Sequence, residues 1–220
     1  MATSILTRLM TVPAPLMPIA EKIEAGVRIT TEEALALYTS HHLSLLGLWA
    51  TALKRRVSGE YVYFNKNFHM EPTNVCINHC KFCSYRRNPG QKGAWECTLE
   101  EMVEIVKQNA TQAATEVHIV GGVHPDREVR FYADLLKAIR EEAPHLHIKA
   151  FTAVEIDQMC RMGGLSVEEG LALLKEAGLA SMPGGGAEIF DETLRAEICP
   201  DKTSSAEWLR IHDTAHKLGI

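Results

Sequence analysis

The sequence predicts an α/β protein, roughly the N-terminal half of a β/α barrel, with four strand–helix units preceded by a helical segment. From residue 60 onward, short apolar or β-branched runs alternate with amphipathic helical runs, and such alternation produces a parallel sheet with crossover helices. Each unit takes roughly 40 residues, and a barrel of eight units takes about 250. The 220 residues therefore predict four units, with a fifth strand expected to begin at the final "KLGI". A complete four-stranded domain is the alternative, although it would leave an open edge and an uncovered inner face.

The predicted helical segment comprises residues 1–59, and the predicted barrel part comprises residues 60–220. Within the helical segment, residues 17–58 have apolar side chains at helical spacing. Thr30 and Glu33 fit the spacing of a capping box, which marks the start of a helix.

The first two units of the barrel part follow directly. The aromatic and β-branched run "EYVYFNKNFHM" predicts one or two strands. A cysteine-rich loop comes next, and Thr98 with Glu101 forms a second capping box that opens a helix. The second unit has the strand "EVHIVGG" and the helix "REVRFYADLLKAIREEAP", which Pro144 ends.

The third and fourth units have the same pattern. "HLHIKAF" predicts the third strand, and Ser166 with Glu169 caps a helix that ends at Gly178. "LASMPGGG" predicts the fourth strand, and Ser204 with Glu207 caps the last helix. One face of that helix carries Trp208, Ile211, Ala215 and Leu218.

Composition excludes several classes of function. The chain is 46% hydrophobic and 23% charged with a net charge of −5, which gives no broad attraction to nucleic acid. No apolar run is long enough to span a bilayer. Residues 1–20 lack a basic start and Arg8 interrupts their apolar part, which indicates a ragged terminus and not a secretion signal. Clustered cysteines in such a chain indicate metal or redox chemistry in a reducing cytoplasm.

Three cysteines, Cys76, Cys80 and Cys83, lie within eight residues in "NVCINHCKFCSYRR". A structural zinc site needs four ligands, so His69 or His79 would have to complete it. The alternative is a 4Fe–4S cluster held by three thiolates, in which one iron keeps an open position that a substrate can occupy. The isolated cysteines Cys97, Cys160 and Cys199 fit the role of small apolar residues.

The spacing Cys-x-x-x-Cys-x-x-Cys, with Phe82 immediately before the last cysteine, resembles the signature of the radical S-adenosylmethionine (SAM) superfamily. The resemblance implies a radical SAM β/α barrel in which the amino and carboxylate groups of SAM chelate the fourth iron. It implies that the reduced cluster passes one electron to the sulfonium and releases methionine and a 5′-deoxyadenosyl radical. A one-electron donor of the flavodoxin or ferredoxin type is then expected as a partner, together with a small-molecule substrate.

The resemblance also implies residues that contact SAM. Phe82 lies beside the cluster, and Gly121 and Gly122 match the glycine pair that contacts the amino group of methionine. The segment after the fourth strand lies near the ribose in that superfamily, so Met182, Pro183 and Gly184 are candidates there.

Polar side chains on the same rim of the predicted barrel are further candidates. Thr152 and Glu155 follow the third strand, and Glu155 can bind the SAM ribose or the substrate, or cap a following short helix. His124 can bind a substrate carboxylate or carry a proton, so Glu155 and His124 are the catalytic candidates. Candidates for substrate binding follow the cluster loop, namely Tyr85, Arg86 and Arg87. Arginine binds carboxylates through two parallel hydrogen bonds.

A longer set of segments resembles one family within the superfamily, the aminodeoxyfutalosine synthases of menaquinone biosynthesis. These segments are "FHMEPTNVCINHCKFCSYRR", "EVHIVGGVHPD", "HIKAFTAVEI", "MPGGGAEIFD", "EICPDK" and "HDTAHKLGI". The resemblance implies that the adenosyl radical adds to 3-[(1-carboxyvinyl)oxy]benzoate and gives 6-amino-6-deoxyfutalosine with loss of the carboxylate carbon. The alternative is a relative that abstracts hydrogen, either the tyrosine-using subunit of deazaflavin synthase or the cyclase of the same menaquinone route.

Overall fold

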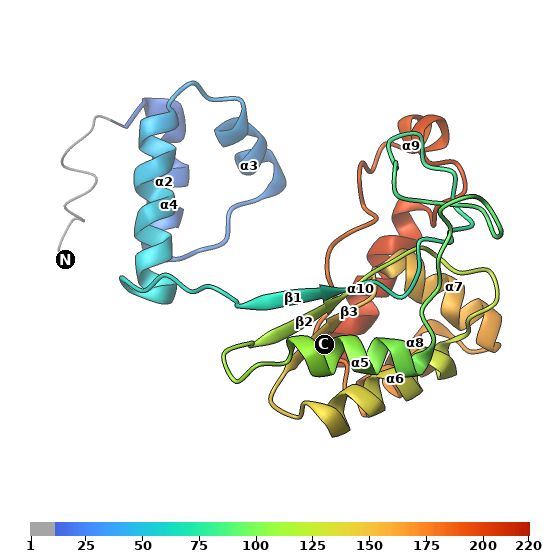
Figure 1. The fold of residues 1–220 in the computed structure, drawn as a ribbon. Coiled ribbons are helices and arrows are strands. Elements are labelled where there is room, and N and C mark those ends of the chain that lie inside the picture. The colour runs from blue at the N-terminus through green and yellow to red at the C-terminus, as the bar shows by residue number, and fades with distance from the viewer. Residues whose placement is uncertain (1–11) are drawn as a thin grey trace. The chain divides into compact units, whose positions relative to one another are not determined.

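The computed structural model describes residues 12–220, and the chain divides into two compact units with the boundary between Phe64 and Asn65 (Figure 1). The expectation of a ragged terminus falls partly on residues 1–11, which lie outside the described residues. Residues 14–16, which were expected to be irregular as well, form a short 3-10 helix.

The N-terminal unit is helical, as the sequence predicts. Its elements are η1 (Ala14–Leu16), α2 (Met17–Ala25), α3 (Thr31–Tyr38) and α4 (Leu43–Ser58). The predicted capping box at Thr30 and Glu33 is present at the start of α3. A small apolar core holds the unit together, and it consists of Val12, Leu16, Ile19, Ala20, Leu45 and Trp49.

The C-terminal unit contains a parallel sheet in the order β1-β2-β3. The strands are β1 (Asn67–Met70), β2 (Glu116–Ile119) and β3 (His147–Ala150). The helices are α5 (Leu99–Asn109), α6 (Val129–Glu142), α7 (Ala153–Gly163), α8 (Val167–Ala177), α9 (Glu192–Ile198) and α10 (Ser205–Lys217). This arrangement confirms the predicted partial barrel of parallel strands connected by helices.

The core of this unit lies between the sheet and its helices, and Figure 1 shows α5, α6 and α8 along one face of the sheet. Met70, Ile119 and Ala150 project from the three strands into this core and are almost fully buried. Burial of such apolar side chains is the main stabilising contribution to the fold. The predicted face of α10 also packs here, because Ile211 and Ala215 belong to the same core.

The capping boxes that the sequence predicts at Thr98 and at Ser166 are both present, at the starts of α5 and α8. At α10, Ser204 accepts a hydrogen bond from the Glu207 N–H. The Glu207 carboxylate pairs instead with Arg210, so only half of that predicted box forms.

Two predicted strands differ from the structure. The first strand covers only Asn67–Met70, because the preceding residues 61–64 are exposed and lie outside the sheet. The fourth predicted strand makes one bridge, between Lys149 and Ser181. Pro183 follows closely and lacks the N–H that a longer ladder needs.

The carboxyl ends of the three strands lie at one edge of the sheet, because the strands are parallel. The cysteine loop, the glycine pair and Thr152 follow these ends. Ligands of β/α barrels bind at this edge, so the fold places the sequence-predicted segments where a site is expected. Among the described residues, no helix has the length and hydropathy that a membrane crossing requires.

Candidate active site

The cysteine loop leaves β1 through Thr73 and Asn74, two buried polar residues. The Thr73 hydroxyl donates a hydrogen bond to the Trp95 carbonyl oxygen at 2.8 Å, and the Trp95 N–H donates to the Asn74 side-chain oxygen at 2.9 Å. The Arg87 N–H donates to the Asn74 carbonyl oxygen at 2.8 Å. The outgoing and returning parts of the loop are therefore tied together, which fixes the cysteines between them.

The glycine pair after β2 packs directly against this loop. The Gly122 N–H donates to the Thr73 carbonyl oxygen at 2.7 Å, and a Cβ atom on Gly122 would overlap the carbonyl group of Val75. A Cβ on Gly121 would lie 2.8 Å from the Thr73 carbonyl oxygen. Glycine is thus required at both positions for the close approach of two backbones.

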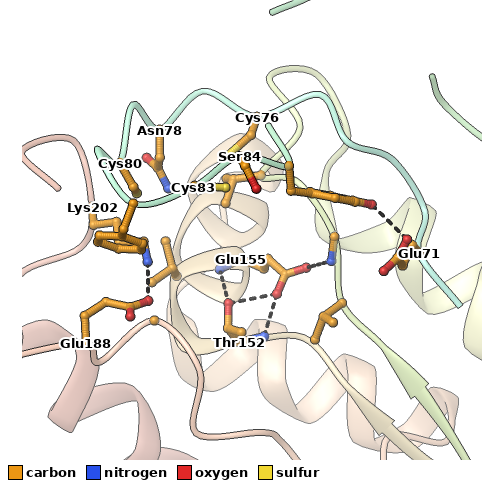
Figure 2. Close-up of a pocket in the computed structure, with 17 residues that line it drawn as sticks. Glu71, Cys76, Asn78, Cys80, Cys83, Ser84, Thr152, Glu155, Glu188 and Lys202 are labelled. Atoms are coloured by element: carbon orange, nitrogen blue, oxygen red, sulfur yellow. Dashed lines mark hydrogen bonds and ion pairs between the residues drawn. The ribbon is translucent and has the colours of Figure 1, made fainter. Parts of the chain in front are cut away.

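A cavity of about 490 Å³ opens between the cysteine loop and the ends of the strands (Figure 2). Pockets of this size hold small organic ligands. Its lining residues are Glu71, Cys76, Asn78, Cys80, Phe82, Cys83, Ser84, Tyr85, Val120, Gly121, Val123, Thr152, Val154, Glu155, Gly186, Glu188 and Lys202.

All three clustered cysteines line this cavity as free thiols. Burial raises the pKa of the Cys80 thiol, and the positive charge of Lys202 opposes that rise. Between residues 12 and 220, no three side chains of the metal-binding types converge as ligands of one ion. A cubane cluster takes one thiolate per iron at separate corners, so three thiols along one cavity wall fit that donor set.

The two histidines that could complete a zinc site are engaged elsewhere. Nδ1 of His79 lies 3.0 Å from the Asp201 carboxylate. The ring of His69 stacks on His118 with 4.8 Å between centroids. Neither ring lines the cavity with the cysteines.

Glu155 lies opposite the cysteines on the first turn of α7 (Figure 2). Its carboxylate accepts hydrogen bonds from the N–H and hydroxyl of Thr152, at 2.7 and 2.8 Å, and from the Gly121 N–H at 3.1 Å. Burial raises the pKa of Glu155 to about 7, although these hydrogen bonds oppose the rise. Glu155 therefore caps α7 and lines the cavity at once, and its carboxyl exchanges a proton near neutral pH.

The turn from β3 into α7 places Thr152 and Glu155 at the cavity. Phe151, between the strand and the helix cap, has a φ of 60°, a left-handed conformation that is costly for a residue with a Cβ. Its ring is fully buried against Tyr132, with 5.0 Å between ring centroids. This packing holds the unusual backbone and redirects the chain toward the cavity.

Lys202 reaches the cavity from the segment between α9 and α10, and sequence reasoning missed it. Its ammonium lies 2.7 Å from the Glu188 carboxylate and 5.2 Å from the centre of the Phe82 ring. Among the described lining residues it is the one lysine or arginine, whereas three carboxylates line the same space. The signal in the sequence was "EICPDK", whose lysine is separated from the cysteines by more than a hundred residues.

The same segment holds the cysteine loop through its backbone. The Lys81 N–H donates to the Ile198 carbonyl oxygen at 2.8 Å, and the His79 N–H donates to the Asp201 carboxylate at 3.1 Å. These contacts flank Cys80 on both sides. The α9–α10 segment is thus a structural support of the cysteine loop as well as the source of Lys202.

Five other residues suggested by the sequence line the cavity together with the cysteines, namely Phe82, Tyr85, Gly121, Thr152 and Glu155. The Tyr85 hydroxyl donates to Glu71 at 3.2 Å, and burial, with Glu71 adding to it, raises the pKa of Tyr85 far above its usual range. Tyr85 is therefore a neutral hydrogen-bonding group in this cavity.

The remaining candidates do not line it. They are Arg86, Arg87, Gly122, His124, Met182, Pro183 and Gly184. Arg86 bonds Asn88, and Arg87 bonds carbonyl groups of its own loop. Met182 packs against the apolar core. Gly186, a glycine of the same segment that the sequence analysis did not single out, lines the cavity instead.

His124 is engaged through both ring nitrogens. Nδ1 accepts hydrogen bonds from the N–H groups of Asp126 and Arg127, so Nε2 carries the proton that is donated to Glu96 at 2.7 Å. The Arg127 guanidinium donates to the Cys97 carbonyl oxygen at 2.8 Å. The histidine therefore ties the loop after β2 to the end of the cysteine loop.

These features define a class of protein: a partial β/α barrel whose carboxyl edge presents three thiols and a buried acid to a ligand-sized cavity. Residues 70–220 match the model of the family described as "Radical SAM superfamily", and the chain belongs to this superfamily. Its enzymes use a 4Fe–4S cluster and SAM, and act on small molecules with the help of an electron donor.

Similar proteins include the aminodeoxyfutalosine synthase of Thermus thermophilus, which is 42% identical over 93% of this chain and 55% of its own length. The 5-amino-6-(D-ribitylamino)uracil–L-tyrosine 4-hydroxyphenyl transferase of Methanothermobacter thermautotrophicus is 37% identical over 87% of this chain and 53% of its own length. The chain thus spans about half the length of these curated relatives.

Among solved structures, the FeFe-hydrogenase maturase HydG from Carboxydothermus hydrogenoformans superposes with a TM-score of 0.67. That similarity covers 94% of this chain and 46% of HydG at 21% sequence identity. At this identity it supports the fold, namely that of a radical SAM barrel in part.

Proposed function

We propose that this chain carries the cluster-binding part of an aminodeoxyfutalosine synthase, a radical SAM transferase of menaquinone biosynthesis. The reaction joins the 5′-deoxyadenosyl group of SAM to 3-[(1-carboxyvinyl)oxy]benzoate and gives 6-amino-6-deoxyfutalosine with loss of the carboxylate carbon. The observation that carries this proposal is the 42% identity, over 93% of the chain, to the Thermus thermophilus protein of that name.

In this proposal Cys76, Cys80 and Cys83 hold the cluster, which supplies one electron to the sulfonium of bound SAM. The cysteines line one wall of the cavity and Glu155 lies on the other. SAM is then bound between them, with Phe82 beside the cluster and Thr152 with Glu155 available to its ribose hydroxyls. The electron comes from a small flavodoxin or ferredoxin.

Buried carboxyl groups suit this binding role. Because the pKa of Glu155 is raised to about 7, the group can donate or accept a hydrogen bond near neutral pH. Three N–H and O–H donors already hold its two oxygens, so its position is fixed before a ligand arrives. We assign His124, whose ring is engaged on both sides, to positioning the cysteine loop and not to substrate binding.

The second candidate function is that of the tyrosine-using subunit of deazaflavin synthase, or of the cyclase of the menaquinone route. The 37% identity to the Methanothermobacter thermautotrophicus transferase favours the tyrosine-using enzyme as this candidate. In a hydrogen-abstracting enzyme the adenosyl group leaves as free 5′-deoxyadenosine. In the proposed synthase it becomes part of the product.

One experiment separates the two functions. The protein is loaded with iron and sulfide without oxygen, reduced, and incubated with SAM in two parallel reactions. One reaction contains the carboxyvinyl substrate, and the other contains tyrosine and 5-amino-6-(D-ribitylamino)uracil. The products of both are identified by mass spectrometry. A product that contains both the adenine ring and the benzoate supports the proposed synthase. Free 5′-deoxyadenosine without such a product, together with turnover of tyrosine and 5-amino-6-(D-ribitylamino)uracil, would overturn it in favour of the second candidate.

A further inference from the structure

The sheet face that points away from the helices is polar. It carries Asn67 and His69 from β1, Glu116 and His118 from β2, and His147 and Lys149 from β3, because side chains alternate along a strand and the others face the apolar core. The interior of a β/α barrel is usually filled with bulky apolar side chains. Charged and hydrogen-bonding groups on three neighbouring strands therefore indicate a ligand or a buried polar network.

Three of these side chains form one row across the sheet, which we call the inner row: His69, His118 and Lys149. They are direct neighbours in the strand register. Two positions further along β1 and β2 come Glu71 and Val120, which line the cavity. Two residues of a strand span roughly 6.6 Å, so the inner row lies one layer of side chains below the cavity.

The hydrogen-bonding capacity of the inner row is only partly used. The Lys149 ammonium pairs with Glu116 at 2.9 Å, and an ammonium has three donors. Asn65 and Asn67 donate to the same carboxylate at 3.2 Å each, so its charge is shared among several donors. The Lys149 ammonium therefore still has N–H donors for another acceptor.

His118 lacks a hydrogen-bond partner at one ring nitrogen. Its Nε2 atom is buried and has no hydrogen-bond partner, a costly arrangement that proteins rarely keep without a reason. Burial lowers the pKa of His118, and the charge of Lys149 adds to the effect. The ring is therefore neutral at neutral pH, and in the tautomer protonated at Nε2 it offers one N–H donor beside the Lys149 ammonium.

We propose that the inner row is a binding subsite for the aryl carboxylate of the substrate, with Lys149 supplying the charge and His118 Nε2 a hydrogen bond. This inference rests on the proposed function and adds residues to it. The reacting double bond has to lie in the cavity beside SAM. An aromatic ring separates the ring carboxylate of 3-[(1-carboxyvinyl)oxy]benzoate from that bond. The length of this ring is comparable to the depth of one layer of side chains, which separates the inner row from the cavity.

The test uses two unreactive probes and the cluster-loaded protein with SAM and no reductant. The saturated acid 3-(1-carboxyethoxy)benzoate carries the ring carboxylate, and 3-(1-carboxyethoxy)benzamide lacks it. Calorimetry is expected to show that the protein binds the acid at least tenfold more tightly than the amide. Lys149→Met is expected to abolish this preference and to leave the affinity for SAM unchanged, whereas Lys149→Arg retains it.

Two further variants keep the test decisive. Lys149→Met leaves the buried Glu116 carboxylate without its ammonium partner. Glu116→Gln combined with Lys149→Met therefore removes both charges if the single variant does not fold. Lys137→Met, on the exposed face of α6 beside Asp134, is the charge-matched control and should keep the full preference. Equal affinity of the unaltered protein for the acid and the amide, or a preference that survives in the double variant, would overturn the inference.

The outcome is separate from that of the proposed function, because binding is measured without turnover. A protein that prefers the acid through Lys149 but makes no adenosylated product would contradict the reaction and keep the subsite. A protein that makes the product but binds the acid without Lys149 would contradict the subsite alone.

Discussion

The N–H of Gly121, at the end of β2, donates a hydrogen bond to Oε1 of Glu155, on the first turn of α7, at 3.1 Å. This bond connects two neighbouring strand ends at the floor of the cavity. Thr152 donates twice to the other oxygen of the same carboxylate. One buried acid therefore fixes the relative positions of the segments that face the cysteines.

The first prediction concerns the pH dependence of stability. The pKa of Glu155 is raised from its ordinary 4.5 to about 7 by burial, so the folded protein holds a proton on this group that the unfolded chain releases above pH 4.5. The contribution of Glu155 to the free energy of unfolding is then full below about pH 4.5 and falls as the pH rises to about 7. At about 1.4 kcal/mol per unit of pKa, the fall amounts to roughly 3 kcal/mol.

Glu155→Gln isolates this effect, because the variant lacks the titrating group. Urea unfolding of both proteins between pH 4.5 and 8 is expected to show the difference in stability shrinking by roughly 3 kcal/mol as the pH rises. If the difference in stability between the two proteins stays constant over this range, Glu155 has the same pKa in the folded and unfolded states and the prediction is wrong.

The second prediction concerns the close packing of the glycine pair. In Gly122→Ala the new methyl group overlaps the Val75 carbonyl group, and the cysteine loop has to move. Overpacking of this kind costs about 1–3 kcal/mol. Iron binding after anaerobic reconstitution is expected to fall well below that of the unaltered protein, with a lower melting temperature.

Gly47→Ala is the matched control for that experiment. Apart from its chain neighbours and the backbone of its own helix, no atom lies within 4 Å of a Cβ at Gly47. The residue is inside helix α4, where alanine is preferred over glycine by about 1 kcal/mol. This variant should melt no lower than the parent and bind the same amount of iron. Equal iron content in both variants would refute the packing argument.

Local signals predicted the parts of the fold that depend on neighbours in the chain. Thr98 and Ser166, each followed three residues later by glutamate, cap their helices as predicted because the capping box uses only local bonds. The strand at Ser181 was overpredicted because a strand needs a partner ladder, and only its bridge to Lys149 forms. Composition alone carries no information about that pairing.

The cysteines of the site were predictable from the sequence, and the other residues that line the cavity were less so. Cys76, Cys80 and Cys83 are neighbours in the sequence and line one cavity. Glu188 and Lys202 come from segments more than a hundred residues away, and only tertiary contacts bring them to Cys80. Their pairing had no signature in spacing or periodicity.

The third prediction concerns the cysteines themselves. Cys80→Ala removes one of three thiols that line the cavity, and a cubane held by two protein thiolates is labile. We expect the variant to retain little iron after reconstitution and to lose cleavage of SAM. Cys97→Ser, at a thiol outside the cavity lining, should retain both. Full SAM cleavage in Cys80→Ala would contradict the assignment of the cluster ligands.

The fourth prediction concerns the charge of Lys202, which lies 2.7 Å from Glu188 and over the Phe82 ring. A nearby positive charge stabilises the reduced, more negative form of a cluster. Lys202→Met should therefore shift the reduction potential of the cluster to more negative values, and Lys202→Arg should keep it close to the parent value. Spectroelectrochemical titration of the SAM-free protein measures the shift. The same potential in the methionine variant would mean that Lys202 acts only through its contacts with the loop.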